Sequence, residues 1–187
     1  MEFIDLKYQQ SLIRENIQKA IDQILDHGQY IMGPEVTELE AQLALFANSN
    51  YCVSCSSGTD ALYMALMAYD IGPGDLVFTS PFTFIATAEV ISLTGATPVF
   101  VDVNSFTFNI DPEKLEQAIS SDGIKGEPRA ILGVDIFGLP ADYEQIKTIG
   151  TKHDLIIIED AAQSFGAEYR GRKAGSFGHL GATSFFP

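Results

Sequence analysis

The chain has 187 residues, of which 46% are apolar and 19% are charged. This length allows one domain with a substantial core, and the composition is too apolar for a disordered protein. The 25 acidic residues outnumber the 11 basic ones, and the net charge of −14 disfavours nucleic acid and anionic membranes as partners. The apolar runs are far shorter than the ~18 residues of a membrane span, and the N-terminus lacks a signal-peptide pattern, so we expect a cytoplasmic protein.

Two helices are predicted at the start of the chain. Residues 8–27 carry apolar side chains at helical spacing in one stripe, and Gly28 suits the end of this helix. Pro34 and Glu35 suit the start of a second helix. The link between the two helices holds an aromatic residue, Tyr30.

A strand is predicted at residues 51–55, and it leads directly into a helix through Ser57, Gly58 and Thr59. A turn of small hydroxyl residues with a glycine suits an oxyanion, because the backbone can approach closely and the first N–H groups of a helix lack partners. The alternative interpretation is ordinary N-capping by Ser57 or Thr59. The turn matches neither the Walker loop nor the dinucleotide-binding glycine pattern.

The two cysteines, Cys52 and Cys55, form a C-x-x-C pair inside the predicted strand. Their spacing places the side chains on opposite faces of a strand, and no second cluster of Cys or His is near in sequence. We therefore interpret both as small core residues and expect no metal site.

Three further strands are predicted at residues 76–79, 97–103 and 129–137, and each is followed by a helical pattern. The loop after the first of these strands carries Phe82 and Phe84. An aromatic side chain at a strand's carboxyl end can stack on a planar ring. The alternative is that both belong to the core.

The stretch LIIIEDAAQS combines a buried strand with polar chemistry. Leu155 to Ile158 are four consecutive apolar residues, as in a strand buried on both faces of a parallel sheet. The strand ends in Glu159 and Asp160, and the amide of Gln163 follows. Ligands of open α/β sheets bind at the carboxyl ends of the strands, so Asp160 is well placed to contact one. The alternative is that Asp160 caps the next helical turn.

Strand and helix alternate about six times with short links, which predicts an α/β fold with a mostly parallel sheet covered on both faces. The C-terminal stretch is rich in glycine and ends in a strand-like segment at residues 183–186. No helical pattern follows this last segment, so we expect residues 1–187 to be part of a longer polypeptide.

Three of the predicted loops suit one ligand. One can hold a phosphate, one can stack on a flat ring, and one offers an acid and an amide. Pyridoxal phosphate needs a phosphate cup, a ring platform and a carboxylate that keeps its pyridine nitrogen protonated, so that the ring can accept electrons. A nicotinamide or flavin needs no such acid at a ring nitrogen.

The chain resembles the sugar-nucleotide aminotransferases of the DegT/DnrJ/StrS type, which are fold type I pyridoxal-phosphate enzymes. The resemblance runs over the whole length, and its opening segments look most like aminotransferases acting on a UDP-linked 3-keto-N-acetylglucosaminuronate. The matching blocks are GPEVTELE, SSGTDAL, PFTFIATAEVI, PVFVDV, FNIDPEKLEQAI, VDIFGLPADYEQI, IIEDAAQSFGAEYRGRKAG and TSFFP. The resemblance implies the three-layer large domain of the aspartate aminotransferase-like fold.

The resemblance also implies roles for individual residues. Asp160 would bind the pyridine nitrogen, Gln163 the ring hydroxyl, and Phe84 would stack on the ring. Gly58, Thr59 and Ser184 would hold the phosphate, and Gly28 and Tyr30 would contact the nucleotide sugar. Glutamate would donate the amino group to a keto sugar in surface polysaccharide synthesis, and a homodimer would share the active sites.

One landmark of the family lies outside this sequence. The Schiff-base lysine is expected two residues after Pro187, so the 187 residues contain no catalytic residue of their own and lack the small C-terminal domain. Relatives with histidine at that position are sugar dehydratases, which is one alternative function. A non-catalytic binder of cofactor or sugar nucleotide, with neither lysine nor histidine there, is the other.

Overall fold

The computed structural model describes residues 5–121 and 123–185. The chain divides between Gln42 and Leu43 into two units. Within the described residues, no helix is both long and apolar enough to cross a membrane.

The first unit contains α1 (Leu6–His27) and the start of α2 (Pro34–Ala47), which confirms the two predicted helices. The Asp5 carboxylate accepts the Tyr8 N–H at 2.9 Å and begins α1, and Gly28 ends it in the left-handed conformation at φ 69°. The apolar stripe of α1 forms no core, because none of the residues of this helix is buried.

The second unit is built on a five-stranded parallel sheet, which confirms the predicted α/β architecture. Its order is β2-β1-β3-β4-β7, and every neighbouring pair is parallel. The strands are β1 (Asp75–Thr79), β2 (Thr97–Phe100), β3 (Glu127–Val134), β4 (Ile156–Asp160) and β7 (Leu180–Ala182).

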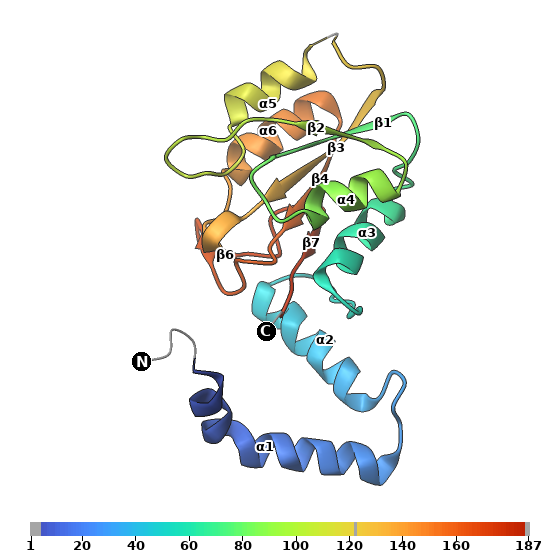
Figure 1. The fold of residues 1–187 in the computed structure, drawn as a ribbon, viewed down its shortest axis with the longest axis vertical. Coiled ribbons are helices and arrows are strands. Elements are labelled where there is room, and N and C mark those ends of the chain that lie inside the picture. The colour runs from blue at the N-terminus through green and yellow to red at the C-terminus, as the bar shows by residue number, and fades with distance from the viewer. Residues whose placement is uncertain (1–4, 122, 186–187) are drawn as a thin grey trace. The chain divides into compact units, whose positions relative to one another are not determined.

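Helices cover both faces of this sheet, as Figure 1 shows. One face packs against α3 (Gly58–Ala68) and α4 (Ala86–Leu93), and the other against α5 (Pro112–Ile119) and α6 (Tyr143–His153). Side chains alternate between the two cores, because successive residues of a strand point to opposite faces. In β4, Ile157 lies in the core with α5 and α6, whereas Ile158 lies in the core with α3 and α4.

Two short elements complete the second unit. The 3₁₀ turn η1 (Ile136–Gly138) follows β3, and a hairpin of β5 (Glu168–Tyr169) and β6 (Arg172–Lys173) follows β4. The hairpin turn places Arg170 and Gly171 at positive φ, as a two-residue type I′ turn requires.

Two predicted strands are wrong. Residues 51–55 are predicted as a short strand but form none, because no strand among the described residues pairs with them. At the C-terminus, the strand is β7 at Leu180–Ala182, and Thr183–Phe185 lie beyond it. The prediction that both cysteines are core residues also fails, because Cys55 is exposed and Cys52 is only half-buried.

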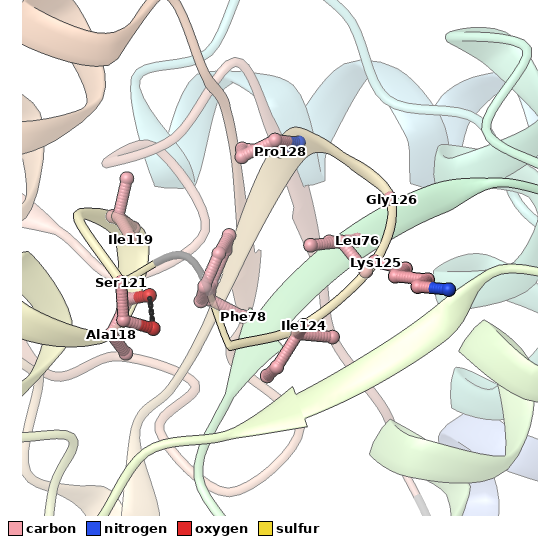
Figure 2. A pocket seen from close by; sticks show the side chains of 9 residues that line it. All are labelled: Leu76, Phe78, Ala118, Ile119, Ser121, Ile124, Lys125, Gly126 and Pro128. Atoms are coloured by element: carbon pink, nitrogen blue, oxygen red, sulfur yellow. Dashed lines mark hydrogen bonds between the residues drawn. The ribbon is translucent and has the colours of Figure 1, made fainter.

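A pocket of about 430 Å³ lies at the amino ends of β1 and β3, under the segment that follows α5. Leu76 and Phe78 of β1 line it, and Figure 2 shows them together with Ile119 and Ile124, which also line it. This pocket is at the opposite end of the strands from Asp160.

Candidate active site

The carboxyl ends of β3, β4 and β7 are joined by main-chain hydrogen bonds. The Asp135 N–H donates to the Asp160 carbonyl at 3.0 Å, and the Ala161 N–H donates to the Ala182 carbonyl at 2.7 Å. These bonds bring together the polar segments that follow each strand. Three of the six predicted site residues of the second unit, Asp160, Gln163 and Ser184, lie at these strand ends.

Asp160 ends β4 with its side chain buried, and only 6% of the residue is exposed. The Thr87 hydroxyl of α4 donates to Oδ2 at 2.8 Å, and the Ala162 N–H donates to Oδ1 at 3.2 Å. The second bond is the capping contact of the alternative interpretation, so Asp160 does stabilise the following turn. A carboxylate has about four acceptor sites, so two bonds leave capacity for a further donor.

Burial raises the pKa of Asp160, and the hydrogen bonds from Thr87 and Ala162 partly oppose this. Within the part of the chain that the structure describes, no cation forms an ion pair with Asp160. A buried carboxylate is normally paired with a cation, because its desolvation is unfavourable. Asp160 is therefore suited to a cationic donor supplied by a ligand.

The segment between β1 and α4 reaches Asp160 through two threonines. The hydroxyls of Thr83 and Thr87 are 2.8 Å apart, and Thr87 then bonds Asp160. Phe84 lies in this segment and is 68% exposed, so its ring is not part of the core. Phe82 packs instead against Phe108 and Phe137, with ring centroids 5.6 and 5.8 Å apart.

Gln163 is exposed, and its amide is oriented by a main-chain contact. Its Oε1 accepts the N–H of Phe137 at 2.9 Å, so its NH₂ group remains a donor for a ligand oxygen. Phe137 has the left-handed φ of 56°, which is unfavourable for a residue other than glycine. Strain of this kind concentrates at functional sites.

Gly58 and Ser184 lie against each other at the start of α3. A Cβ atom on Gly58 would come within 2.9 Å of the Ser184 Cβ, so a larger residue would displace Ser184. Ser57 is the N-cap, and its side chain accepts the Asp60 N–H at 3.1 Å, as the alternative interpretation predicts. Capping does not exclude a ligand here, because Gly58 and Thr59 belong to the same first turn, whose N–H groups lack helical partners.

Two predicted site residues, Gly28 and Tyr30, lie in the first unit. Tyr30 is 67% exposed, and Gly28 has nothing within 4 Å of an added Cβ atom. Their contact with a nucleotide sugar stays a prediction.

The structure also places four polar residues near the site that the sequence analysis did not assign. Ser164 is buried, and its hydroxyl donates to Oδ2 of Asp135 at 2.9 Å. Asp135 and Glu159 form a buried acid pair, and Thr87 bonds Asp160. In the sequence, each of the four is only a polar residue beside an apolar run, which is a weak indication of a functional role.

The family model of the DegT/DnrJ/EryC1/StrS aminotransferase family matches residues 11–187. The chain belongs to this family. It is 49% identical over 187 residues to the UDP-2-acetamido-2-deoxy-3-oxo-D-glucuronate aminotransferase of Pseudomonas aeruginosa, covering 100% of this chain and 51% of that protein. It is also similar to a DegT DnrJ EryC1 StrS aminotransferase from Brucella abortus, with a TM-score of 0.97 and 48% identity over 100% of this chain and 51% of that one.

A less similar solved structure, that of a protein named a sugar aminotransferase, also matches. The PLP-form of Spr1654 from Streptococcus pneumoniae has a TM-score of 0.79 and 30% identity, covering 89% of this chain and 46% of that one. These likenesses confirm the expected fold, that of the pyridoxal-phosphate aminotransferases. The chain spans about half the length of the family members it matches.

Proposed function

We propose that the complete polypeptide is a pyridoxal-phosphate-dependent aminotransferase that transfers an amino group from glutamate to a keto group of a UDP-linked sugar. The proposed acceptor is UDP-2-acetamido-3-keto-glucuronate, used in surface polysaccharide synthesis. Its 49% identity to an aminotransferase of that name supports this substrate class. We further propose a cytoplasmic homodimer, as the family resemblance implies.

The main support for this proposal comes from the surroundings of the Asp160 carboxylate. Its carboxylate is buried at the carboxyl end of β4, has two donors of its own, and has no cation opposite it among the described residues. A protonated pyridine nitrogen would supply both the missing positive charge and an N–H donor. Pairing with this cation would lower the pKa of Asp160, which burial alone raises.

The neighbouring residues fit the rest of the cofactor. The N–H groups of Gly58 and Thr59 in the first turn of α3, with the Ser184 hydroxyl beside them, suit a phosphate. The NH₂ group of Gln163 suits the ring oxygen, because its carbonyl is already taken by Phe137. The exposed ring of Phe84 offers a stacking face.

The bound cofactor would supply an electron-accepting ring that stabilises negative charge on the substrate carbon next to nitrogen. The residues of this chain would bind and orient that ring. Asp160 would keep the ring nitrogen protonated, which is the condition for the ring to accept electrons. The proton transfers themselves need the expected lysine beyond Pro187, and Gly28 and Tyr30 are proposed to contact the nucleotide sugar.

An absorbance experiment on the complete polypeptide tests the proposal. With pyridoxal phosphate added, we expect a long-wavelength band that disappears on addition of glutamate and returns on addition of the keto sugar nucleotide. A protein that binds the cofactor but gives no change with glutamate would contradict the aminotransferase function. In that case, histidine two residues after Pro187 would indicate the dehydratase, and the absence of both lysine and histidine the non-catalytic binder.

A further inference from the structure

Two buried acids lie at the carboxyl ends of β3 and β4 next to Asp160, on the face of the sheet that carries α6. Asp135 follows β3 and Glu159 is in β4, and both residues are 0% exposed. Their carboxyl groups lie close enough to form a hydrogen bond with each other. A hydrogen bond between two carboxyl groups requires a proton on one of them.

The surrounding donors indicate which acid is ionised. Asp135 accepts the Tyr143 hydroxyl at 2.9 Å, the Ser164 hydroxyl at 2.9 Å and the Ala141 N–H at 3.1 Å. Three donors stabilise a charged carboxylate. Glu159 accepts two donors, the N–H groups of Gly175 and Phe177, so we expect Glu159 to be the member that carries the proton and donates to Asp135.

The electrostatic surroundings agree with this assignment. Burial and the charge of Asp135 together raise the pKa of Glu159 to about 8, although the N–H groups of Gly175 and Phe177 lower it. Burial also raises the pKa of Asp135, but the hydrogen bonds that it accepts oppose this, and the pKa of Asp135 is about 6.

The other titratable groups near the pair do not neutralise it. Tyr143 and Lys147 face it from α6, and Asp160 is the next residue of β4. Arg172 of β6 interacts with Lys147. None of the ion pairs between described residues includes Asp135 or Glu159.

The pair connects two parts of the proposed site. On one side, the main chain of Asp135 bonds Asp160 at 3.0 Å, and its carboxylate holds Ser164, the residue after Gln163. On the other side, the oxygens of Glu159 accept the N–H groups of Gly175 and Phe177, at 2.5 and 2.7 Å.

The turn held by Glu159 supports the phosphate side of the site. A Cβ atom on Gly181 of β7 would meet the Gly175 carbonyl, so this turn packs directly against the strand that leads to Ser184. A displacement of the turn would therefore reach Ser184.

We infer that Glu159 is a positioning residue that holds one buried proton between itself and Asp135, and that this proton fixes the Asp160–Gln163 segment and the β7 strand in one arrangement. Loss of the proton leaves two adjacent buried negative charges, which repel each other and loosen both segments. The inference rests on the proposed function for its cofactor readout only, because the proton itself can be observed without cofactor.

Infrared spectroscopy of the complete polypeptide without cofactor tests the proton. At pH 7 we expect a carbonyl band of a neutral carboxylic acid that is absent in Glu159→Gln and unchanged in the surface control Glu113→Gln. Since Glu159→Gln also places an amide against a backbone N–H, Asp135→Asn is a second variant. Removing the charge of Asp135 should move the midpoint of the band's pH titration from about 8 to lower pH. A band that none of these variants changes would overturn the inference.

Binding of pyridoxal phosphate between pH 7 and pH 9.5 tests the positioning role. We expect the dissociation constant of the unaltered protein and of Glu113→Gln to rise by up to about tenfold per pH unit above the pKa of Glu159. In Glu159→Gln, which keeps a donor to Asp135 but cannot lose a proton, the rise should be at least about threefold smaller per unit. Equal pH dependence in all three proteins would overturn the positioning role. Failure of all three to bind the cofactor at any pH would instead contradict the proposed function, and the infrared result would still decide the buried proton.

Discussion

Glu159 and Asp160 are neighbours in β4, yet their side chains lie on opposite faces of the sheet in different surroundings. Glu159 faces α6 and is fully supplied by this chain, with two backbone N–H donors and the carboxylate of Asp135. Asp160 faces α4 and accepts two donors, and no ion pair between described residues includes it. Burial raises the pKa of both acids, but only the Asp160 carboxylate keeps acceptor sites that a ligand can use.

The largest expected effect comes from neutralising Asp160. Asp160→Asn should reduce transamination by the complete polypeptide by about 100-fold or more, because the ring nitrogen loses its charged partner. The free energy of unfolding should change by less than about 1 kcal/mol, since Asn retains an acceptor for Thr87. Steady-state kinetics and urea denaturation measure the two effects. Near-normal turnover in this variant would remove Asp160 from the ring nitrogen.

The next largest effect is expected on the free energy of unfolding, from a variant beside the acid pair of Asp135 and Glu159. Tyr143→Phe removes the hydroxyl that bonds the Asp135 carboxylate at 2.9 Å while keeping the ring stacked on Phe177. Hydrogen bonds to charged groups contribute about 1.5–3 kcal/mol, so we expect a loss of about 2 kcal/mol in urea denaturation. Tyr51→Phe, at an exposed position, is the matched control and should have no effect. Equal stability of the two variants would contradict an ionised Asp135.

The pH dependence of stability should separate the two acids further. Burial raises the pKa of Glu159 from 4.5 to about 8, so the folded state binds more protons than the unfolded state between these values. The contribution of Glu159 to the free energy of unfolding is therefore fully present below pH 4.5 and decreases as pH rises, by up to about 1.4 kcal/mol per unit. Thermal or urea unfolding across this range should show a shallower decline for Glu159→Gln. Parallel curves for the two proteins would show that Glu159 titrates normally.

The smallest effect is expected at the hydroxyl that supports Asp160. Thr87→Val preserves the shape of a fully buried side chain but removes the donor to Oδ2. We expect about a fivefold to tenfold weaker binding of pyridoxal phosphate, equivalent to about 1 kcal/mol, measured by absorbance titration. Thr151→Val, on the exposed surface of α6, controls for the loss of a hydroxyl. Unchanged affinity would mean that Asp160 is oriented without Thr87.

The α/β fold could be predicted from the sequence because the local patterns of apolar residues also agree with the tertiary packing. Of the predicted apolar run, Ile157 and Ile158 are buried in β4, and the helical pattern that follows residues 97–103 is α5. The segment 51–55 shows the limit. Its apolar residues fit a strand, but a strand also needs a neighbour, and the structure pairs none with it among the residues it describes.

Only part of the site could be predicted from the sequence, because some of its contacts depend on how the strands pack together. Asp160, Gln163, Gly58 and Ser184 stand at the ends of predicted elements, and parallel strands bring such ends to one edge. The contact of Asp135 with Glu159 depends on the packing of β3 beside β4 and on the turn that follows β6, which no local pattern specifies. The left-handed conformation of Phe137 was also not predictable, because that conformation is normally predicted only at glycine or asparagine.

The role proposed for Asp160 is to pair with a protonated ring nitrogen. NMR of the complete polypeptide loaded with cofactor carrying an isotope label at that nitrogen measures its protonation directly. We predict a protonated nitrogen in the unaltered protein up to alkaline pH and an unprotonated one in Asp160→Asn. An unprotonated nitrogen in the unaltered protein at neutral pH, or the same signal in both proteins, would contradict the account.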